Sequence, residues 1–338
     1  MLSAATLCPY TNRSGKRSVF EAPGNTQPSS HSVTSLSIII AVYNDWIPLE
    51  QCLESLAVQR SAPAFEVIVV DDGSYTQAPA RLLEHLTAYR SRIVRQPHSG
   101  ISVARNSGIQ VATSPLLLFV DADSRLQADC LRQLVSTVEA HSEHNCFQLQ
   151  LIGNRSTLIG KSEELRLITL QDHLRVNACI RYVNTAGFAI RSASIEPGKD
   201  LFNPTVLRGE DTLLLLDLLE SGELPLYALA AVVQHATPLT IFRCLQKDIR
   251  SAYREGKAYK IAAARELRIR VTHRERLTML KAMWKTSAQP SIGRTAWFVL
   301  TLRQALQRVI SLANKILHRD LDERQIARTS DRESATLL

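Results

Sequence analysis

Residues 37–45 read SIIIAVYND, an apolar run with a polar end from which the fold class can be inferred. Its continuous β-branched residues are typical of a strand buried on both faces of a sheet. The same pattern returns as FEVIVVDDGS at 65–74 and as LLLFVDADS at 116–124, and a shorter strand is expected at 92–95. Apolar residues at helical spacing separate these strands. Four alternations of strand and helix predict an α/β fold with a mainly parallel sheet flanked by helices.

The chain of 338 residues has room for this domain and for additional segments. The α/β domain is expected over 35–238, as a first half at 35–140 and a second half at 141–238. Further strands are expected in the second half at 147–152, 186–190 and 227–233, with a leucine-dense helix at 211–220. Outside the domain we expect three segments, which are a disordered leader at 1–34, a basic helical extension at 239–320 and a flexible tail at 321–338.

Composition and charge narrow the class of protein. Hydrophobic residues make up 45% and charged residues 21%, which excludes a disordered chain or a fibre. The net charge is +8, but residues 241–320 hold 18 Lys and Arg against 5 Asp and Glu, a net charge of +13. This asymmetry indicates an anionic partner for that segment. A peripheral membrane contact through 241–320 and a helical subdomain packed on the sheet are both open, whereas nucleic acid is the less expected partner.

Cysteine usage and hydropathy bear on the compartment. The six cysteines are scattered without a CxxC pair, as in a protein whose thiols stay reduced. The first residues lack a signal-peptide pattern, and no uncharged apolar run approaches the roughly 20 residues of a membrane span. We therefore expect a cytoplasmic protein, with the inner face of the membrane as a further possibility.

Acidic residues follow two of the expected parallel strands. Asp71 and Asp72 end one strand, and Asp121 and Asp123 end another. The carboxyl ends of parallel strands meet at one edge of a sheet, where ligands bind. Carboxylates there suit a divalent cation, manganese or magnesium, together with phosphate oxygens. Acidic residues that simply cap turns are the alternative for each pair.

Four further residues each have both a chemical and a structural interpretation. Arg105 lies one turn into an expected helix, where a guanidinium suits a diphosphate or merely covers the surface. Glu210 and Asp211 begin the leucine-dense helix, as an N-terminal cap or as a general base. His235 ends a strand and is either structural or a ligand of a metal or phosphate.

The order of these motifs strongly resembles the inverting, bacterial-type family 2 glycosyltransferases of the GT-A fold. The resemblance runs from Ser37 to Ala140 and continues more weakly through TAGFAIR at 185–191 and Gly209-Glu210-Asp211. It implies a metal-dependent enzyme that moves a sugar from a nucleotide-diphosphate-sugar, foremost a UDP-sugar, to an acceptor hydroxyl with inversion. The acceptor would be a sugar, a lipid-linked molecule or a protein, in the synthesis of cell-surface polysaccharide, glycolipid or glycoprotein.

The resemblance also implies roles for single residues. Tyr43 would lie against the base and Asp72 would hydrogen-bond it. Asp121 and Asp123 would form the DxD motif, the first toward the ribose or sugar and the second on the metal. Arg105 would support the donor side. Asp211 would be the catalytic base, while Glu210, His235 and Asp71 are further candidates.

Two departures from the family pattern keep an alternative open. Asp217 stands where the family commonly has Arg, and the glycine-rich turn before the Glu-Asp pair is reduced to Pro197-Gly198-Lys199-Asp200. The alternative is a catalytically silent protein that binds a nucleotide-sugar or acts as a scaffold on the same fold. A nucleotidyltransferase is disfavoured, because Tyr43-Asn44-Asp45 follows the first strand in place of a Gly-rich basic loop.

Overall fold

The computed structural model describes residues 35–235 and 273–310 without interruption. It also describes 10–11, 17–18, 312–313 and scattered positions between 244 and 265. Strands β1 (Tyr10–Thr11) and β2 (Arg17–Ser18) pair antiparallel. The rest of the expected leader, all of the expected tail at 321–338 and much of 239–272 lie outside the described residues.

The first half of the domain is the predicted βαβ series. Its four strands pair in parallel in the order β5-β4-β3-β6. These strands are β3 (Leu36–Val42), β4 (Phe65–Asp71), β5 (Arg90–Arg95) and β6 (Leu116–Asp121). The helices that connect or follow them are α1 (Trp46–Ala57), α2 (Ala80–Thr87), α3 (Ile101–Val111) and α4 (Cys130–Ala140). The parallel order explains the long β-branched runs, because helices cover both faces of these strands.

The second half extends the same sheet with mixed strand directions. Strand β11 (Phe188–Arg191) runs antiparallel between β6 and β8 (Cys146–Gly153). Strand β12 (Leu226–His235) is parallel to β8 and also pairs with the short β7 (Ser124–Leu126). Beyond β12 lie the two-residue strands β10 (Cys179–Ile180) and β9 (Arg175–Val176).

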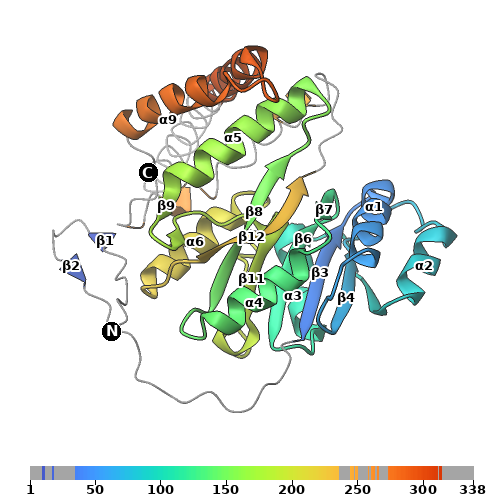
Figure 1. Cartoon of the computed structure of the whole chain (residues 1–338). Helices are drawn as coiled ribbons and strands as arrows, with labels where there is room; N and C mark the ends of the chain where they lie inside the picture. The colour runs from blue at the N-terminus through green and yellow to red at the C-terminus, as the bar shows by residue number, and fades with distance from the viewer. Residues whose placement is uncertain are drawn as a thin grey trace, which may run out of the picture.

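Two apolar cores form on the two faces of the sheet. Figure 1 shows the helices that cover these faces. Successive residues of β3 belong to opposite cores. Ile38 and Ile40 pack with α1, α2 and α4, while Ile39 packs with α3 and α6 (Glu210–Glu220). This alternation follows from the two-residue period of a strand. The helix α3 and the start of α6 are thereby held on one face, beside the ends of β3 and β6.

The structure differs from the sequence-based expectation at two places in the second half. The strand expected from residue 186 begins at Phe188, because Thr185–Gly187 form a 3₁₀ turn in which the Asn184 side chain accepts a hydrogen bond from the Ala186 amide. The 17-residue helix α5 (Leu158–Leu174) was not expected. Its buried face includes polar Glu164 and Gln171, so the sequence shows no clean apolar stripe.

The C-terminal helices pack against α5. Helix α9 (His273–Thr286) lies alongside α5 (Figure 1), and a further helical stretch covers 294–310. Leu165 of α5 meets Met283, Ile292, Ala296 and Leu300 in a small apolar cluster. Among the described residues, no helix has the length and apolar character needed to cross a bilayer.

A buried ion network also attaches the extension to the domain. Arg303 lies 2.6 Å from a Glu163 carboxylate oxygen and 2.7 Å from Asp248. Burial opposes the charge on Glu163, but Arg166 and Arg303 outweigh it and lower the pKa of Glu163 to about 2. Because unpairing a buried charge is costly, this network fixes which face of the 294–310 helix turns inward.

Gly108 tests the packing that positions α3. A Cβ at this position would collide with Ile39 Cγ2 and lie 3.3 Å from Val70 Cγ2. We expect Gly108→Val to lower the free energy of unfolding by about 1–3 kcal/mol, because α3 would have to move away from β3. The matched control is Gln110→Val on the exposed side of the same helix, with an effect within about 0.5 kcal/mol. Equal urea midpoints for the two variants would contradict the close approach.

Candidate active site

The ends of the parallel strands bring the acidic residues to one edge of the sheet. In the register of β3 with its two neighbours, Val42 lies opposite Asp71, and Ala41 lies opposite Asp121. The two acidic strand ends therefore flank the end of β3, as their positions in the sequence predict. Each carboxylate has its own surroundings at this edge.

A buried arginine joins two of these carboxylates. The Arg105 guanidinium donates to Asp121 Oδ1 at 2.8 Å and to Glu210 Oε1 at 2.9 Å. It lies 5.5 Å from the centre of the Phe202 ring and is 3% exposed. Burial disfavours its charge, but the neighbouring carboxylates more than compensate and raise the pKa of Arg105. Arg105 thus connects α3, the end of β6 and the start of α6.

Asp211 lies beside this arginine bridge. Thr185 donates its hydroxyl proton to Asp211 Oδ1 at 3.0 Å. Burial, followed by the nearby charge of Glu210, raises the pKa of Asp211 to about 7, although Arg105 acts in the opposite direction. A carboxyl group with this pKa takes up a proton readily near neutral pH, which suits a general base.

A glycine sets the direction in which α6 begins. Gly209 has a φ of 89°, in the left-handed region that favours glycine. A Cβ at this position would lie 2.7 Å from the Ala258 Cβ. The left-handed turn and the close approach place Glu210 and Asp211 at the first turn of α6.

Asp121, Asp123 and His235 form a cluster of metal-ligand type. One side-chain ligand atom from each lies within 4.8 Å of the others. The pairing of β7 with β12 places Ser124 opposite His235, so Asp123 and His235 become neighbours, with His235 Nε2 3.6 Å from Asp123 Oδ1. Two carboxylates and an imidazole, each partly exposed, fit a divalent cation that also takes phosphate oxygens.

The Asp71-Asp72 pair organises the neighbouring turn. Asp71 accepts from the Ser74 amide at 2.8 Å, as a turn-capping residue does. Asp72 accepts from the Ser99 and Gly100 amides, each at 2.9 Å. Its carboxylate also accepts from Gln96 Nε2 at 2.8 Å and lies 2.8 Å from His98 Nδ1. Asp72 therefore holds the turn that leads into α3 and Arg105.

Aromatic rings form an exposed surface next to the Asp72 turn. The rings of Tyr43 and His98 stack, with centroids 4.1 Å apart and planes at 19°. Tyr75 meets Tyr43 edge-on at 6.4 Å. Tyr43 is 42% exposed and Tyr75 is 82% exposed, so both rings offer apolar surface to a ligand.

Contacts connect most of the predicted site residues. Arg105, Asp121, Glu210 and Asp211 share one charged group, and Asp123 and His235 join it through Asp121. Tyr43 and Asp72 belong to the adjoining turn, and Asp71 faces Ser74 and Arg95. Sequence reasoning missed Thr185, Tyr75 and the contacts of His98. A ring stack between residues far apart in the sequence leaves no spacing pattern that could have revealed the role of His98.

Asp217, one of the two departures from the family pattern, has contacts outside this group. Asp217 pairs with Arg265 at 2.6 Å and has a side chain that is 47% exposed.

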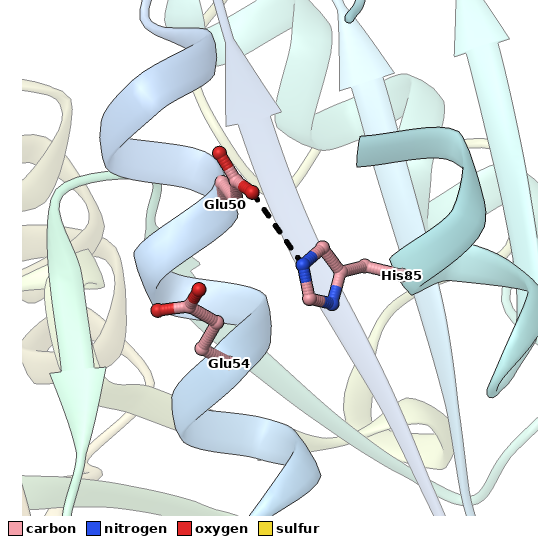
Figure 2. Close-up of side chains that lie close together, drawn as sticks. All are labelled: Glu50, Glu54 and His85. Atoms are coloured by element: carbon pink, nitrogen blue, oxygen red, sulfur yellow. Dashed lines mark ion pairs between the residues drawn. The ribbon is translucent and has the colours of Figure 1, made fainter. Parts of the chain in front are cut away.

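A second cluster of ligand-type side chains lies between α1 and α2 (Figure 2). Glu50 Oε1 is 3.5 Å from His85 Nε2, and Glu54 lies on the next turn of α1. The Arg81 guanidinium already lies 2.6 Å from the same Glu50 oxygen. Because Arg81 compensates the charge of Glu50, this cluster is a surface ion-pair group.

Comparison with known proteins finds a family similarity over the first part of the described sheet. Residues 37–196, just under half of the chain, match the family described as Glycosyl transferase family 2. That segment is similar to the glycosyltransferase domains of this family. Asp211 and His235 lie beyond the matched range.

Two relatives and one solved structure illustrate the similarity. The Escherichia coli protein named Uncharacterized glycosyltransferase YibD is 38% identical over 97 residues, which cover 28% of each chain. Succinoglycan biosynthesis protein ExoO of Rhizobium meliloti is 25% identical over 232 residues, or 65% of this chain and 66% of the relative. The mannosyltransferase PcManGT of Pyrobaculum calidifontis, in complex with GDP-Man and Mn²⁺, has a TM-score of 0.53 at 17% identity, covering 87% of this chain and 83% of that one. This likeness confirms the GT-A type of fold.

Arg105 tests the shared charged group. We expect Arg105→Met to lower the free energy of unfolding by about 3–5 kcal/mol, because Asp121 and Glu210 would face each other without a cation. The double variant Arg105→Met/Glu210→Gln should recover part of this loss in urea denaturation. Additive losses from the two single variants, within about 0.5 kcal/mol, would contradict the bridge.

Proposed function

We propose that this chain is an inverting, metal-dependent glycosyltransferase that moves a sugar from a nucleotide-diphosphate-sugar to an acceptor hydroxyl. The observation that carries the proposal is the Arg105 bridge between Asp121 and Glu210. It joins the strand-end carboxylates of the family 2 domain to the start of α6, where Asp211 has its raised pKa. One site then contains groups for the donor and a base for the acceptor.

The donor nucleotide would lie at the ends of β3 and β4. The exposed Tyr43 ring, stacked on His98, offers a flat surface for a base. Asp72 would accept from the base or hold the turn that shapes its site. Asp121 would face the ribose or sugar, and Arg105 would compensate negative charge on the donor side. We propose a UDP-sugar as the first donor to test.

Asp121, Asp123 and His235 would hold a divalent cation, manganese or magnesium. Such a cation, when bound, compensates the charge that develops on the diphosphate leaving group. Asp123 is proposed as the main ligand, and the β7–β12 pairing provides His235 as an additional one.

Asp211 is proposed as the general base. Its carboxylate takes the proton of the acceptor hydroxyl while the acceptor oxygen forms a bond to the anomeric carbon. The bond from that carbon to the diphosphate oxygen breaks, and the nucleoside diphosphate leaves with the bonding electrons. Attack on the face opposite the leaving group inverts the anomeric configuration. Thr185 orients the Asp211 carboxylate through its hydrogen bond.

The acceptor class and the cellular setting are also proposals. The name of the Rhizobium meliloti relative favours polysaccharide synthesis, so a sugar acceptor ranks before a lipid-linked or protein acceptor. The domain would occupy 35–238, with the basic extension at 239–320 added to it. We place the protein in the cytoplasm, with peripheral membrane contact through 241–320.

A silent nucleotide-sugar-binding or scaffold protein is the competing function. Asp217 favoured it at the level of sequence, but its side chain pairs with Arg265, away from Arg105 and Asp211. Release of nucleoside diphosphate from a panel of UDP-, GDP- and dTDP-sugars distinguishes the two functions. A donor that binds and is never turned over, with any acceptor class, would favour the scaffold.

Asp211→Asn should abolish transfer and retain donor binding. General-base catalysis contributes about 10²–10⁴-fold, so we expect a fall in kcat of that order. The matched control is Asp217→Asn on the same helix, which should keep the rate of the unaltered protein. Loss of donor binding in calorimetry, together with a normal residual rate, would contradict the role of Asp211.

The rate of the unaltered enzyme should depend on pH through Asp211. The pKa of about 7 means that the base is protonated and inactive below pH 7 and ionised above it. We therefore expect kcat/KM to rise with pH and to level off above about pH 8. A profile that is flat from pH 5 to pH 8 would mean that the base titrates at an ordinary carboxylate pKa of about 4. That result would rule out Asp211 with a raised pKa as the base.

Asp123→Ala should weaken metal-dependent donor binding. We expect the thermal shift that a UDP-sugar causes in the presence of Mn²⁺ to shrink to the shift seen with a chelator. Asp129→Ala is the control, since Asp129 is an exposed carboxylate that pairs with Arg132. Identical metal dependence in the Asp123 variant and the unaltered protein would refute the assignment.

A further inference from the structure

The helix at 294–310 has a second apolar face that no other described part of the chain covers. Its inner face packs on α5 through Ala296 and Leu300, and Ile292, just before the helix, joins the same cluster. On the outer side, Phe298 is 58% exposed, Leu302 71% and Val309 65%. With exposed Ala305 and Leu312, these residues recur every three or four positions and form one stripe. An apolar stripe of this length on a protein surface marks an interaction site.

The stripe continues onto α9 through aromatic residues. Trp284 is 43% exposed, and its ring centroid lies 6.3 Å from that of Phe298. The Arg294 guanidinium lies 3.7 Å from the centre of the Trp284 ring. Tryptophan beside arginine is typical of surfaces that meet both apolar chains and polar headgroups.

The charge around the stripe indicates the chemistry of the partner. Lys281, Lys285 and Arg308 are exposed beside it, within the segment of net charge +13. A second copy of this chain would bring the same positive segment against itself. An anionic bilayer offers both an apolar phase for the stripe and negative headgroups for the cations.

We propose that the outer face of α9 and the 294–310 helix docks on the surface of an anionic phospholipid bilayer. The stripe of Phe298, Leu302 and Val309 would enter the headgroup boundary, with the lysines and arginines at the level of the phosphates. Arg303, paired with Glu163 and Asp248 on the inner side, holds this orientation. The proposal is independent of the transferase chemistry, because none of these residues belongs to the candidate active site.

Vesicle flotation of the full chain tests the proposal. We expect the protein to float with phosphatidylcholine vesicles that contain phosphatidylglycerol, to stay unbound with phosphatidylcholine alone, and to bind less at high salt. Phe298→Asp/Leu302→Asp should reduce the bound fraction about tenfold or more, because two large apolar side chains no longer enter the boundary. Val58→Asp is the matched control, an exposed apolar residue that ends α1 and should leave flotation unchanged.

A second variant separates loss of binding from loss of folding. Lys281→Glu/Lys285→Glu changes only exposed charges and should also reduce flotation with phosphatidylglycerol. Circular dichroism melts verify that each variant is folded. Absence of flotation at low salt, or equal flotation of the unaltered protein and the folded apolar variant, overturns the proposal. The proposal is also overturned if sedimentation shows that the unaltered protein is a dimer and the apolar variant is a monomer. In that case the apolar face would be the contact between two copies of the chain.

Discussion

The candidate site depends on one buried guanidinium group, which lies between a carboxylate at the end of a strand and a carboxylate at the start of a helix. Arg105 is nearly inaccessible to solvent and donates to both Asp121 and Glu210. Without it, Asp121 and Glu210 would be two like charges with no cation between them, and one carboxylate would take up a proton or the two would move apart. The same guanidinium limits how far the pKa of Asp211 rises. Gly108 and Gly209 provide the close approaches that bring α3 and α6 to this point.

A second constraint is the edge between β7 and β12. Asp123 and His235 are 112 positions apart, yet the antiparallel register at Ser124 makes them neighbours. The cluster of ligand type is therefore a consequence of sheet topology. The Glu50, Glu54 and His85 cluster shows the contrast, because its members lie on the consecutive helices α1 and α2, and the Arg81 that pairs with Glu50 has a side chain that is 70% exposed.

Basic residues of the C-terminal segment fall into two groups, one that forms buried ion pairs and one that is exposed on the surface. Arg303 turns inward, where Glu163 and Asp248 compensate its charge and attach the helix to α5. Lys281, Lys285 and Arg308 turn outward beside the exposed apolar stripe. A count of positive charges cannot separate these two groups, although only the outward group is available to a partner.

The βαβ series could be predicted from the sequence, because runs such as residues 37–42 and 65–70 are continuously apolar, as in strands buried on both faces, and are separated by helical patterns. The sequence also placed acidic residues at one edge, since parallel strands end on the same side. It did not reveal α5, whose buried Glu164 and Gln171 interrupt the apolar stripe. Nor did it show that Thr185 would bind Asp211 or that His98 would stack on Tyr43. Those contacts depend on tertiary packing, because they join residues from separate elements and the distance between such residues leaves no local pattern in the sequence.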